Sequence, residues 1–328
     1  MTLLNIAYII IGVALVLFGA DRMTEGASSL ARGMRVPEIV IGLTIVAAGT
    51  SAPELFVSLV SALKGTSDLA VGNVIGSNIF NTTLIVGCSA LVAPMVVAKS
   101  TVKKDIPFAV VASFLLFVLC FDDMDSPHLW GNEISRSDGI ILLIGFMIFM
   151  VYTFRVAKKD GLMPSEEELE ENAELPKDYS KIWRNLFWIV VGLACLILGS
   201  NLFVDAATYV AHRFGVRQSV IGLTIVAGGT SLPELATSVV AAYKGRSAIA
   251  IGNVLGSNVF NILLILGTTA VIHPMRIMGI TIVDLTMMLV TMGFLWLFAF
   301  TKYFVSRKEG AVLVLSFLAY MAWLLYLL

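Results

Sequence analysis

Two glutamates lie within the most apolar parts of this chain, and both close the same short pattern. Residues Thr50–Glu54 read TSAPE, and residues Thr230–Glu234 read TSLPE. An ionised carboxylate inside a long apolar segment is costly and normally marks a pathway for ions or protons. Two such carboxylates together offset the charge of one divalent cation, and carboxylate oxygens are the ligands that Ca²⁺ prefers. We therefore predict that Glu54 and Glu234 bind a cation.

The residues around each glutamate predict a broken helix that offers further oxygen ligands. Thr50 and Glu54 are four residues apart and so share a helix face, and the second pattern repeats this spacing. Pro53 has no N–H, so the carbonyl of Gly49 loses its helical donor, and Pro233 acts in the same way. Within a membrane, such freed backbone is tolerated only where it is buried in protein or lines a cavity.

A second polar segment follows each glutamate and supplies neutral oxygens. Its Asn and Ser residues recur at every fourth position and therefore stack along one helix face. The two trios are Asn73, Ser77, Asn81 and Asn253, Ser257, Asn261. For Asn73 and Asn253, hydrogen bonding between helices is an equally good interpretation. Glycines four residues apart predict close helix packing, and the two pairs are Gly72, Gly76 and Gly252, Gly256.

These patterns belong to an internal repeat with an offset of 180 residues. Residues 41–65 and 221–245 are identical at 18 of 25 positions. Residues 70–81 and 250–261 are identical at nine of 12 positions. The most similar segments are the polar ones, which indicates a shared site rather than packing alone.

The composition predicts that helices of this chain cross a membrane many times. Hydrophobic types make up 58% of the 328 residues and charged types only 14%, against about half and a quarter in soluble domains. Spans need about 20 apolar residues. Ten segments qualify as candidates: Leu3–Ala20, Pro37–Leu63, Leu69–Ala93, Ile106–Phe121, Gly139–Phe154, Leu186–Ala211, Ser219–Tyr243, Ile249–His273, Ile280–Thr301 and Ala311–Leu328.

The predicted fold is an all-α polytopic membrane protein, with ten transmembrane helices arranged as two inverted five-helix repeats. The repeats are residues 1–154 and 186–328, joined by an acidic linker at 155–185. Five spans per repeat bring the second repeat into the membrane from the opposite side. Inverted repeats are typical of transporters whose site lies near the midplane, where the halves meet.

The distribution of Lys and Arg predicts the orientation. With the N-terminus outside, the inner loops hold 17 of the 22 basic residues and the outer loops five. Because cytoplasmic loops carry the excess of Lys and Arg, we expect both termini outside and the linker in the cytoplasm. The protein is accordingly expected in the plasma (inner) membrane, with the lipid bilayer around it.

Several other functions are disfavoured by the sequence. A net charge of −1 leaves no basic excess for nucleic acid. The three cysteines fall in apolar runs with no metal-binding spacing, and the three histidines form no zinc motif. Asp122, Asp123 and Asp125 lack the glycine and final glutamate of an EF-hand. No catalytic motif is found, so an enzyme is not expected.

The two GTSxPE segments, each followed by GNxxGSNxxN, resemble the α-repeats of the calcium/cation antiporter superfamily. Within it, the chain most resembles prokaryotic sodium/calcium exchangers, and the resemblance covers essentially the whole chain. It implies that spans one and six slide across ion sites formed by spans two, three, seven and eight. The implied ligands are Glu54, Glu234, Thr50 and Thr230 for calcium; Ser51, Ser77, Asn81, Ser231, Ser257 and Asn261 for sodium; and the carbonyls of Ala47 and Ala227 for an outer sodium site.

One position departs from the resemblance. Many relatives carry aspartate where this chain has Asn261, so only two central carboxylates remain. We expect a secondary antiporter that exchanges Ca²⁺ for Na⁺ by alternating access, without a cofactor or an obligatory protein partner. A proton/Ca²⁺ exchanger that uses the same glutamates is the main alternative, and a cation channel is a more distant one.

Overall fold

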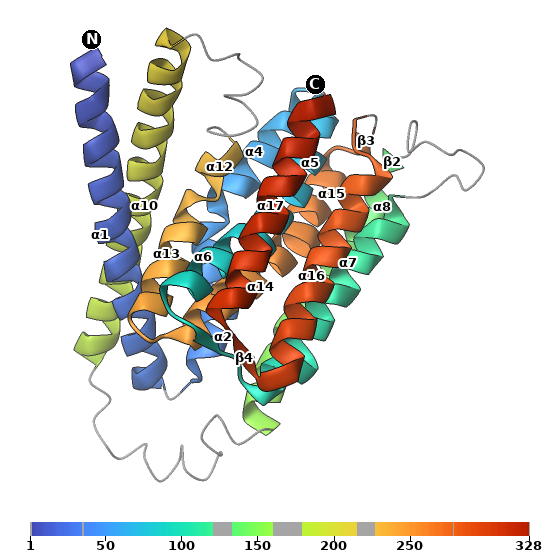
Figure 1. The fold of residues 1–328 in the computed structure, drawn as a ribbon. Helices are drawn as coiled ribbons and strands as arrows, with labels where there is room; N and C mark the ends of the chain where they lie inside the picture. Colours follow the sequence, from blue (N-terminus) through green and yellow to red (C-terminus); the bar gives the residue numbers. More distant parts are fainter. Residues whose placement is uncertain are drawn as a thin grey trace.

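The computed structural model describes residues 2–34, 36–120, 133–159, 179–214, 227–277 and 279–327, and this part of the chain is almost entirely helical (Figure 1). Residues 160–178 of the predicted linker lie outside the described residues. So do Asp122, Asp123 and Asp125, and residues 219–226 of the seventh predicted span.

Most elements follow the predicted segments, but the first helix extends well beyond the predicted end of the first span at Ala20. Those before the linker are α1 (Thr2–Met34), α2 (Glu38–Ile41), η1 (Gly42–Val46), α3 (Ala47–Thr50), α4 (Ala52–Leu63), α5 (Ser67–Phe80), η2 (Asn81–Ile85), α6 (Val86–Val92), β1 (Met95–Val96), η3 (Thr101–Asp105), α7 (Ile106–Leu119), β2 (Glu133–Ile134) and α8 (Arg136–Lys159). Those after it are α10 (Tyr179–Arg213), α12 (Ala227–Thr230), α13 (Leu232–Tyr243), α14 (Ser247–Val259), η6 (Phe260–Leu266), α15 (Gly267–Ile272), β3 (Met275–Arg276), α16 (Ile282–Lys302), β4 (Phe304–Val305) and α17 (Arg307–Leu327).

Six described helices are long and apolar enough to cross a membrane. They are Leu4–Met34, Ser67–Val92, Arg136–Val156, Ile182–Arg213, Ser247–Ile272 and Ile282–Lys302. A seventh span is added if the bent pair Glu38–Thr50 and Ala52–Leu63 counts as one. The multispanning helical fold is therefore present, whereas the count of ten spans stays a prediction.

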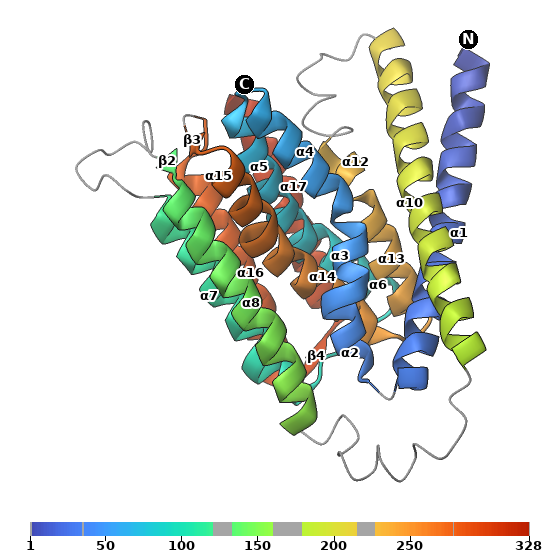
Figure 2. The same cartoon turned by 180° about the vertical axis from the view of Figure 1, so that it is seen from behind.

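Two helices form the centre of the bundle. In the helix Ser247–Ile272, 94% of the apolar 18-residue stretch is buried inside the protein, and in Ser67–Val92 the buried share of that stretch is 72%. The other four candidate spans bury only 22% to 39% of theirs, so their apolar side chains face outward. Helices α7, α8 and α16 cover one side of this centre, and α1 and α10 lie at the opposite side (Figures 1 and 2).

Helices α1 and α10 form an antiparallel pair that stands at the edge of the bundle (Figure 2). The two backbones meet at glycines. A Cβ atom on Gly12 would lie 2.8 Å from the carbonyl oxygen of Gly199, and one on Gly19 would lie 2.6 Å from that of Gly192. Only residues without a side chain permit this approach, because any Cβ there would collide with backbone atoms.

The close glycine contacts come in matched sets. By the 180-residue offset, Gly12 corresponds to Gly192 and Gly19 corresponds to Gly199. The contact between Gly12 and Gly199 therefore has the contact between Gly192 and Gly19 as its counterpart, with the two halves exchanged. Elsewhere, the backbone of α6 meets that of α17 at Gly87 and Gly310, and α15 meets α8 at Gly267 and Gly139. The short strands also pair between the halves. Strand β1 of the first half pairs antiparallel with β4 of the second, and β3 of the second half pairs antiparallel with β2 of the first.

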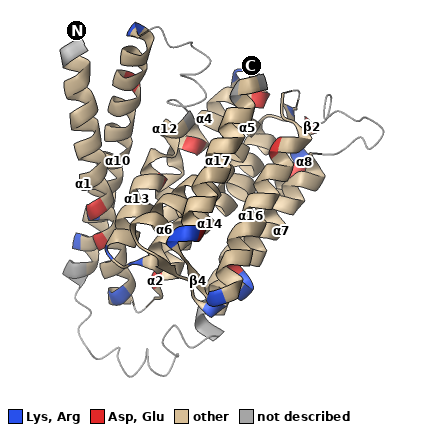
Figure 3. Ribbon diagram, viewed as in Figure 1, with Lys and Arg blue, Asp and Glu red and all other residues tan. Residues whose placement is uncertain are grey.

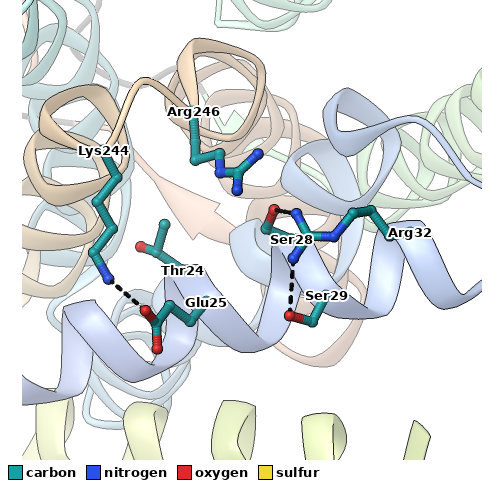
Figure 4. A pocket seen from close by; sticks show the side chains of 7 residues that line it. All are labelled: Thr24, Glu25, Ser28, Ser29, Arg32, Lys244 and Arg246. Carbon is teal, nitrogen blue, oxygen red and sulfur yellow. Dashed lines mark hydrogen bonds and ion pairs between the residues drawn. The ribbon is translucent and has the colours of Figure 1, made fainter. Parts of the chain in front are cut away.

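The amino end of α1 and the carboxyl end of α17 lie at the same end of the molecule, and many of the basic residues gather at the other end (Figure 3). A pocket of about 430 Å³ opens at that charged end between α1 and the α13–α14 turn (Figure 4). Lys244 of the turn pairs with Asp21 at 2.5 Å and with Glu25 at 3.3 Å. Arg246 pairs with Glu38 of α2 at 3.2 Å. These ion pairs tie α1 and α2 to the turn.

Candidate ion-binding site

Both predicted helix breaks are present. A turn at Ser51 separates α3 from α4, and the helices Glu38–Thr50 and Ala52–Leu63 are bent by 46°. Ser231 occupies the same place between α12 and α13. In each case the proline falls within the first two positions of the new helix, where its missing N–H costs nothing. Glu54 and Glu234 then lie in the first turns, and both are buried, with exposures of 0% and 1%.

Each serine at a helix break donates a hydrogen bond to the glutamate of the other half. The Ser51 hydroxyl donates to Oε1 of Glu234 at 3.0 Å, and the Ser231 hydroxyl donates to Oε1 of Glu54 at 3.0 Å. The hydroxyl of Ser77 lies 3.2 Å from that of Ser231. These crossed bonds bring residues from both halves into a single cluster with two carboxylates.

The threonines of the two patterns join the same cluster. Thr50 and Thr230 lie within hydrogen-bonding reach of Glu234 and Glu54, respectively. The single proton of the Thr50 hydroxyl has two further acceptors nearby, Oδ1 of Asn253 at 3.1 Å and the Ala47 carbonyl at 3.4 Å. Both threonines are therefore beside the carboxylate of the opposite half as well as four residues before their own.

Asn73 and Asn253 connect helices. The amide of Asn73 donates to the Glu54 carbonyl at 3.2 Å and to the Ser58 hydroxyl at 2.9 Å. Asn253 makes the corresponding bonds to the Glu234 carbonyl at 3.4 Å and to Ser238 at 2.9 Å. Of the two interpretations open for this pair, hydrogen bonding between helices is the one that these contacts support.

The glycine pairs differ between the halves. A Cβ atom on Gly252 would lie 2.8 Å from the Ile39 carbonyl, and one on Gly256 would lie 2.7 Å from the Leu43 carbonyl. The predicted close packing is thus present at Gly252 and Gly256. A Cβ atom on Gly76 would have no neighbour within 4 Å among the described residues beyond its own helix.

Wider helical turns occur where the asparagines Asn81 and Asn261 lie. Asn81 begins the π-helical segment η2, and Asn261 is the second residue of η6. Such segments are rare and often mark functional positions, because they shift the side chains that follow around the helix. Neither segment was predicted, since no residue pattern in the sequence distinguishes them from α-helix.

Several polar atoms of the predicted ligand residues are buried without a hydrogen-bond partner in the described part of the chain. They are Oε2 of Glu54 and of Glu234, Oδ1 and Nδ2 of Asn81, Oγ of Ser257 and Oδ1 of Asn261. A buried polar atom without a partner costs about 1 to 3 kcal/mol, and an ionised one costs more. A cation bound between these oxygens would offset that cost.

The donor set fits a calcium-sized cation. Ca²⁺ takes six to eight oxygens at flexible geometry, from carboxylates, amides, hydroxyls and backbone carbonyls. No group of three or more His, Cys, Asp or Glu side chains that could hold a metal occurs among the described residues. The charge at this cluster therefore comes from Glu54 and Glu234, which together balance one divalent ion.

Two backbone carbonyls already have donors. The Ala47 carbonyl accepts the Ser51 N–H at 2.9 Å, and the Thr50 hydroxyl lies 3.4 Å from the same oxygen. Ala227 is the first residue of α12. The Gly229 carbonyl, which Pro233 deprives of its helical donor, accepts the Ser200 hydroxyl of α10 at 2.7 Å. The matching residue in α1 is Ala20, so only one half supplies this hydroxyl.

Sequence reasoning missed four polar residues near the cluster. Asn78, Asn258 and Thr82 bond to one another and to Asn261, and Ser200 caps the broken helix. Asn78 and Asn258 directly follow the serines of the trios, but a search at every fourth residue passes over them. The repeat itself was the available signal, because both halves conserve SN at these positions.

Buried carboxylates in the middle of a multispanning helical bundle are the arrangement through which membrane ion transporters bind their cargo. The fold and the cluster thus define an integral multi-pass membrane transporter. The chain belongs to the sodium/calcium exchanger protein family, whose sequence profile matches residues 4–155 and 184–326.

Similar proteins extend over the whole chain. The protein CaxA of Alkalimonas amylolytica is 38% identical over 327 residues, covering 95% of this chain and 96% of CaxA. The sodium/calcium exchanger MaX1 of Methanosarcina acetivorans is 30% identical, with 100% of both chains covered. The solved structure of the sodium-calcium exchanger NCX_Mj superposes with a TM-score of 0.83 at 30% identity, covering 98% of this chain and 99% of that one. These relatives are transporters, not enzymes.

Proposed function

We propose that this protein is a Ca²⁺ antiporter that exchanges Ca²⁺ for Na⁺ across the cytoplasmic membrane by alternating access. The observation that carries the proposal is the crossed pairing of Ser51 with Glu234 and of Ser231 with Glu54. It joins the two carboxylates into one site that a divalent cation can neutralise. Membership of the sodium/calcium exchanger family supports Na⁺ as the counter-ion.

Exchange rather than leak follows from the charge of the empty site. Without a cation, Glu54 and Glu234 are two buried carboxylates in a low-dielectric bundle, which makes movement of the empty site across the membrane costly. Either Ca²⁺ or the counter-ion removes that cost. Each inward movement of one ion is thereby coupled to outward movement of the other.

The ion ligands that we propose are those implied by the resemblance, in two groups that match by the repeat. The first half supplies Ala47, Thr50, Ser51, Glu54, Ser77 and Asn81, and the second half supplies Ala227, Thr230, Ser231, Glu234, Ser257 and Asn261. The buried oxygens of Ser257 and Asn261 that lack a partner among the described residues support this set.

We further propose that the chain crosses the membrane ten times as two inverted five-helix repeats, residues 1–154 and 186–328. The exchanged glycine contacts and the exchanged strand pairs between the halves support this topology. The linker at 155–185 would then lie in the cytoplasm and both termini outside, because many basic residues lie at the end away from the termini (Figure 3).

A proton/Ca²⁺ exchanger is the second candidate. It is favoured by the neutral amides at Asn81 and Asn261, which leave Glu54 and Glu234 as the acidic ligands of the site. Two glutamates can each carry one proton, so release of two protons would balance one Ca²⁺.

The test is uptake of radioactive Ca²⁺ into proteoliposomes that contain the purified protein. The vesicles are preloaded with sodium or with choline at matched pH. Uptake that requires an outward sodium gradient would support the proposal. Uptake that ignores sodium and follows an outward proton gradient would replace Na⁺ by H⁺ as counter-ion, and uptake that needs neither gradient and does not saturate would indicate a channel.

A further inference from the structure

The carboxamide of Asn261 is held in one orientation by a neighbour outside the ligand set. Its Nδ2 donates to Oδ1 of Asn78 at 3.2 Å. Its own Oδ1 is fully buried and has no hydrogen-bond partner among the described residues. The nitrogen of this amide is therefore occupied, and the oxygen is left for another ligand.

The direction of this bond is determined by a backbone carbonyl. Nδ2 of Asn78 lies 3.4 Å from the carbonyl oxygen of Asn258, which can only accept a hydrogen bond. Asn78 must turn its nitrogen toward that carbonyl, so its oxygen faces Asn261. Asn261 must in turn offer its NH₂ group, because two oxygens would leave the contact without a proton.

The corresponding asparagine of the other half is engaged differently. Nδ2 of Asn258 donates to the Thr82 hydroxyl at 2.9 Å, and the Thr82 hydroxyl donates to the backbone carbonyl of Asn78 at 2.8 Å. The repeat places Ile262 opposite Thr82, so no hydroxyl in the second half can engage Asn78 in this way. Asn81, the counterpart of Asn261, keeps both amide atoms unpaired within the described residues, and Oδ1 of Asn258 is unpaired there as well.

We infer that Asn78 is a positioning residue for ion binding, which holds the Asn261 carboxamide with its oxygen available to the cation. The inference rests on the proposed function, since it assumes that Asn261 is an ion ligand. A cation binds the oxygen of an amide and is repelled by the NH₂ group. An Asn261 side chain that could turn over would present the wrong atom for part of the time.

The test uses the difference between asparagine and aspartate at residue 261. Asn78→Ala removes the bond that orients Asn261, and the apparent KM for Ca²⁺ in proteoliposome uptake should rise about three- to ten-fold, the equivalent of one net hydrogen bond. In an Asn261→Asp background, both outer atoms are oxygens and orientation no longer matters. There, Asn78→Ala should not raise the KM, because the oxygen that it removes faces a carboxylate.

Asn258→Ala is the matched control, because Asn258 occupies the repeat position of Asn78 but bonds to Thr82 instead of a proposed ligand. It should leave the Ca²⁺ KM unchanged. Monodisperse elution in detergent verifies that each variant is folded, and the uptake by the Asn78→Ala, Asn261→Asp double variant verifies it independently.

An equal rise in KM in both backgrounds would overturn the inference, because it would mean that Asn78 acts through general packing. No rise in the Asn261 background would overturn it as well. Failure of the proposed function is recognised separately by Glu54→Gln. If that variant still transports Ca²⁺, the site assignment is wrong; if it is inactive while Asn78→Ala behaves as wild type, only the role of Asn78 is wrong.

Discussion

Ser51 donates a hydrogen bond to Glu234 at 3.0 Å although 183 residues separate them along the chain. Ser231 makes the reciprocal bond to Glu54. Each carboxylate is thus oriented by the broken helix of the opposite half, with Oε1 engaged by the serine and Oε2 left without a partner in the described part of the chain. The two breaks therefore form one structural unit.

We expect Ser51→Ala and Ser231→Ala each to lower kcat/KM for Ca²⁺ exchange by about ten- to 100-fold, since a hydrogen bond to a charged group contributes about 1.5 to 3 kcal/mol. Initial uptake rates over a range of Ca²⁺ concentrations measure the effect. Ser113→Ala is the control, because this buried hydroxyl donates only to the Ala109 carbonyl of its own helix. A loss in the control as large as in the two variants would contradict the prediction.

Glu54→Gln and Glu234→Gln should each abolish Ca²⁺ transport. Either change leaves one carboxylate against a divalent cation in a buried site, and an uncompensated charge there costs several kcal/mol, so we expect a loss of about 100-fold or more. Ca²⁺ uptake and Ca²⁺ binding by calorimetry check it. Glu38→Gln, which alters a partly exposed carboxylate at the charged end, should retain transport.

Gly19→Ala should destabilise the protein by about 1 to 3 kcal/mol, because overpacking forces backbone shifts. The added Cβ would lie 2.6 Å from the Gly192 carbonyl and would push α1 away from α10. Thermal unfolding in detergent measures the change. Gly33→Ala is the matched control in the same helix, since a Cβ at Gly33 meets nothing within 4 Å in the described structure, and it should raise or preserve Tm. An unchanged Tm in Gly19→Ala would show that α1 and α10 do not pack in this way.

Asp21→Asn and Lys244→Gln should show coupling in a double-mutant cycle of unfolding free energies. Their ion pair ties α1 to the α13–α14 turn, beside the pocket that Lys244 lines. For such partly exposed groups we expect a coupling of about 0.2 to 1 kcal/mol that decreases at high salt. The repeat replaces Asp21 by Asn201 and Lys244 by Lys64, so the pair Asn201→Ala and Lys64→Gln provides a control in which no coupling is expected. Equal coupling in both cycles would contradict the assignment.

The predictable part of the site was local. The breaks at Ser51 and Ser231 followed from Pro53 and Pro233, and the burial of Glu54 and Glu234 followed from their apolar surroundings. The helix α1, by contrast, extends to Met34, well beyond the predicted end of the first span at Ala20. Hydropathy alone ended that span at the first charges, whereas Asp21 and Glu25 are accommodated in the helix by Lys244.

The sequence by itself determined the multispanning helices, the repeat and the two glutamates with their threonines and prolines. Each of these depends on covalent structure or on neighbours within one or two helical turns, such as the missing N–H of proline. Only the tertiary structure decided that Ser51 bonds to Glu234, that Asn78 orients Asn261, and that Gly19 meets Gly192. Those partners are more than 150 residues apart, and which atoms meet there depends on how the helices pack, a property that no short pattern encodes.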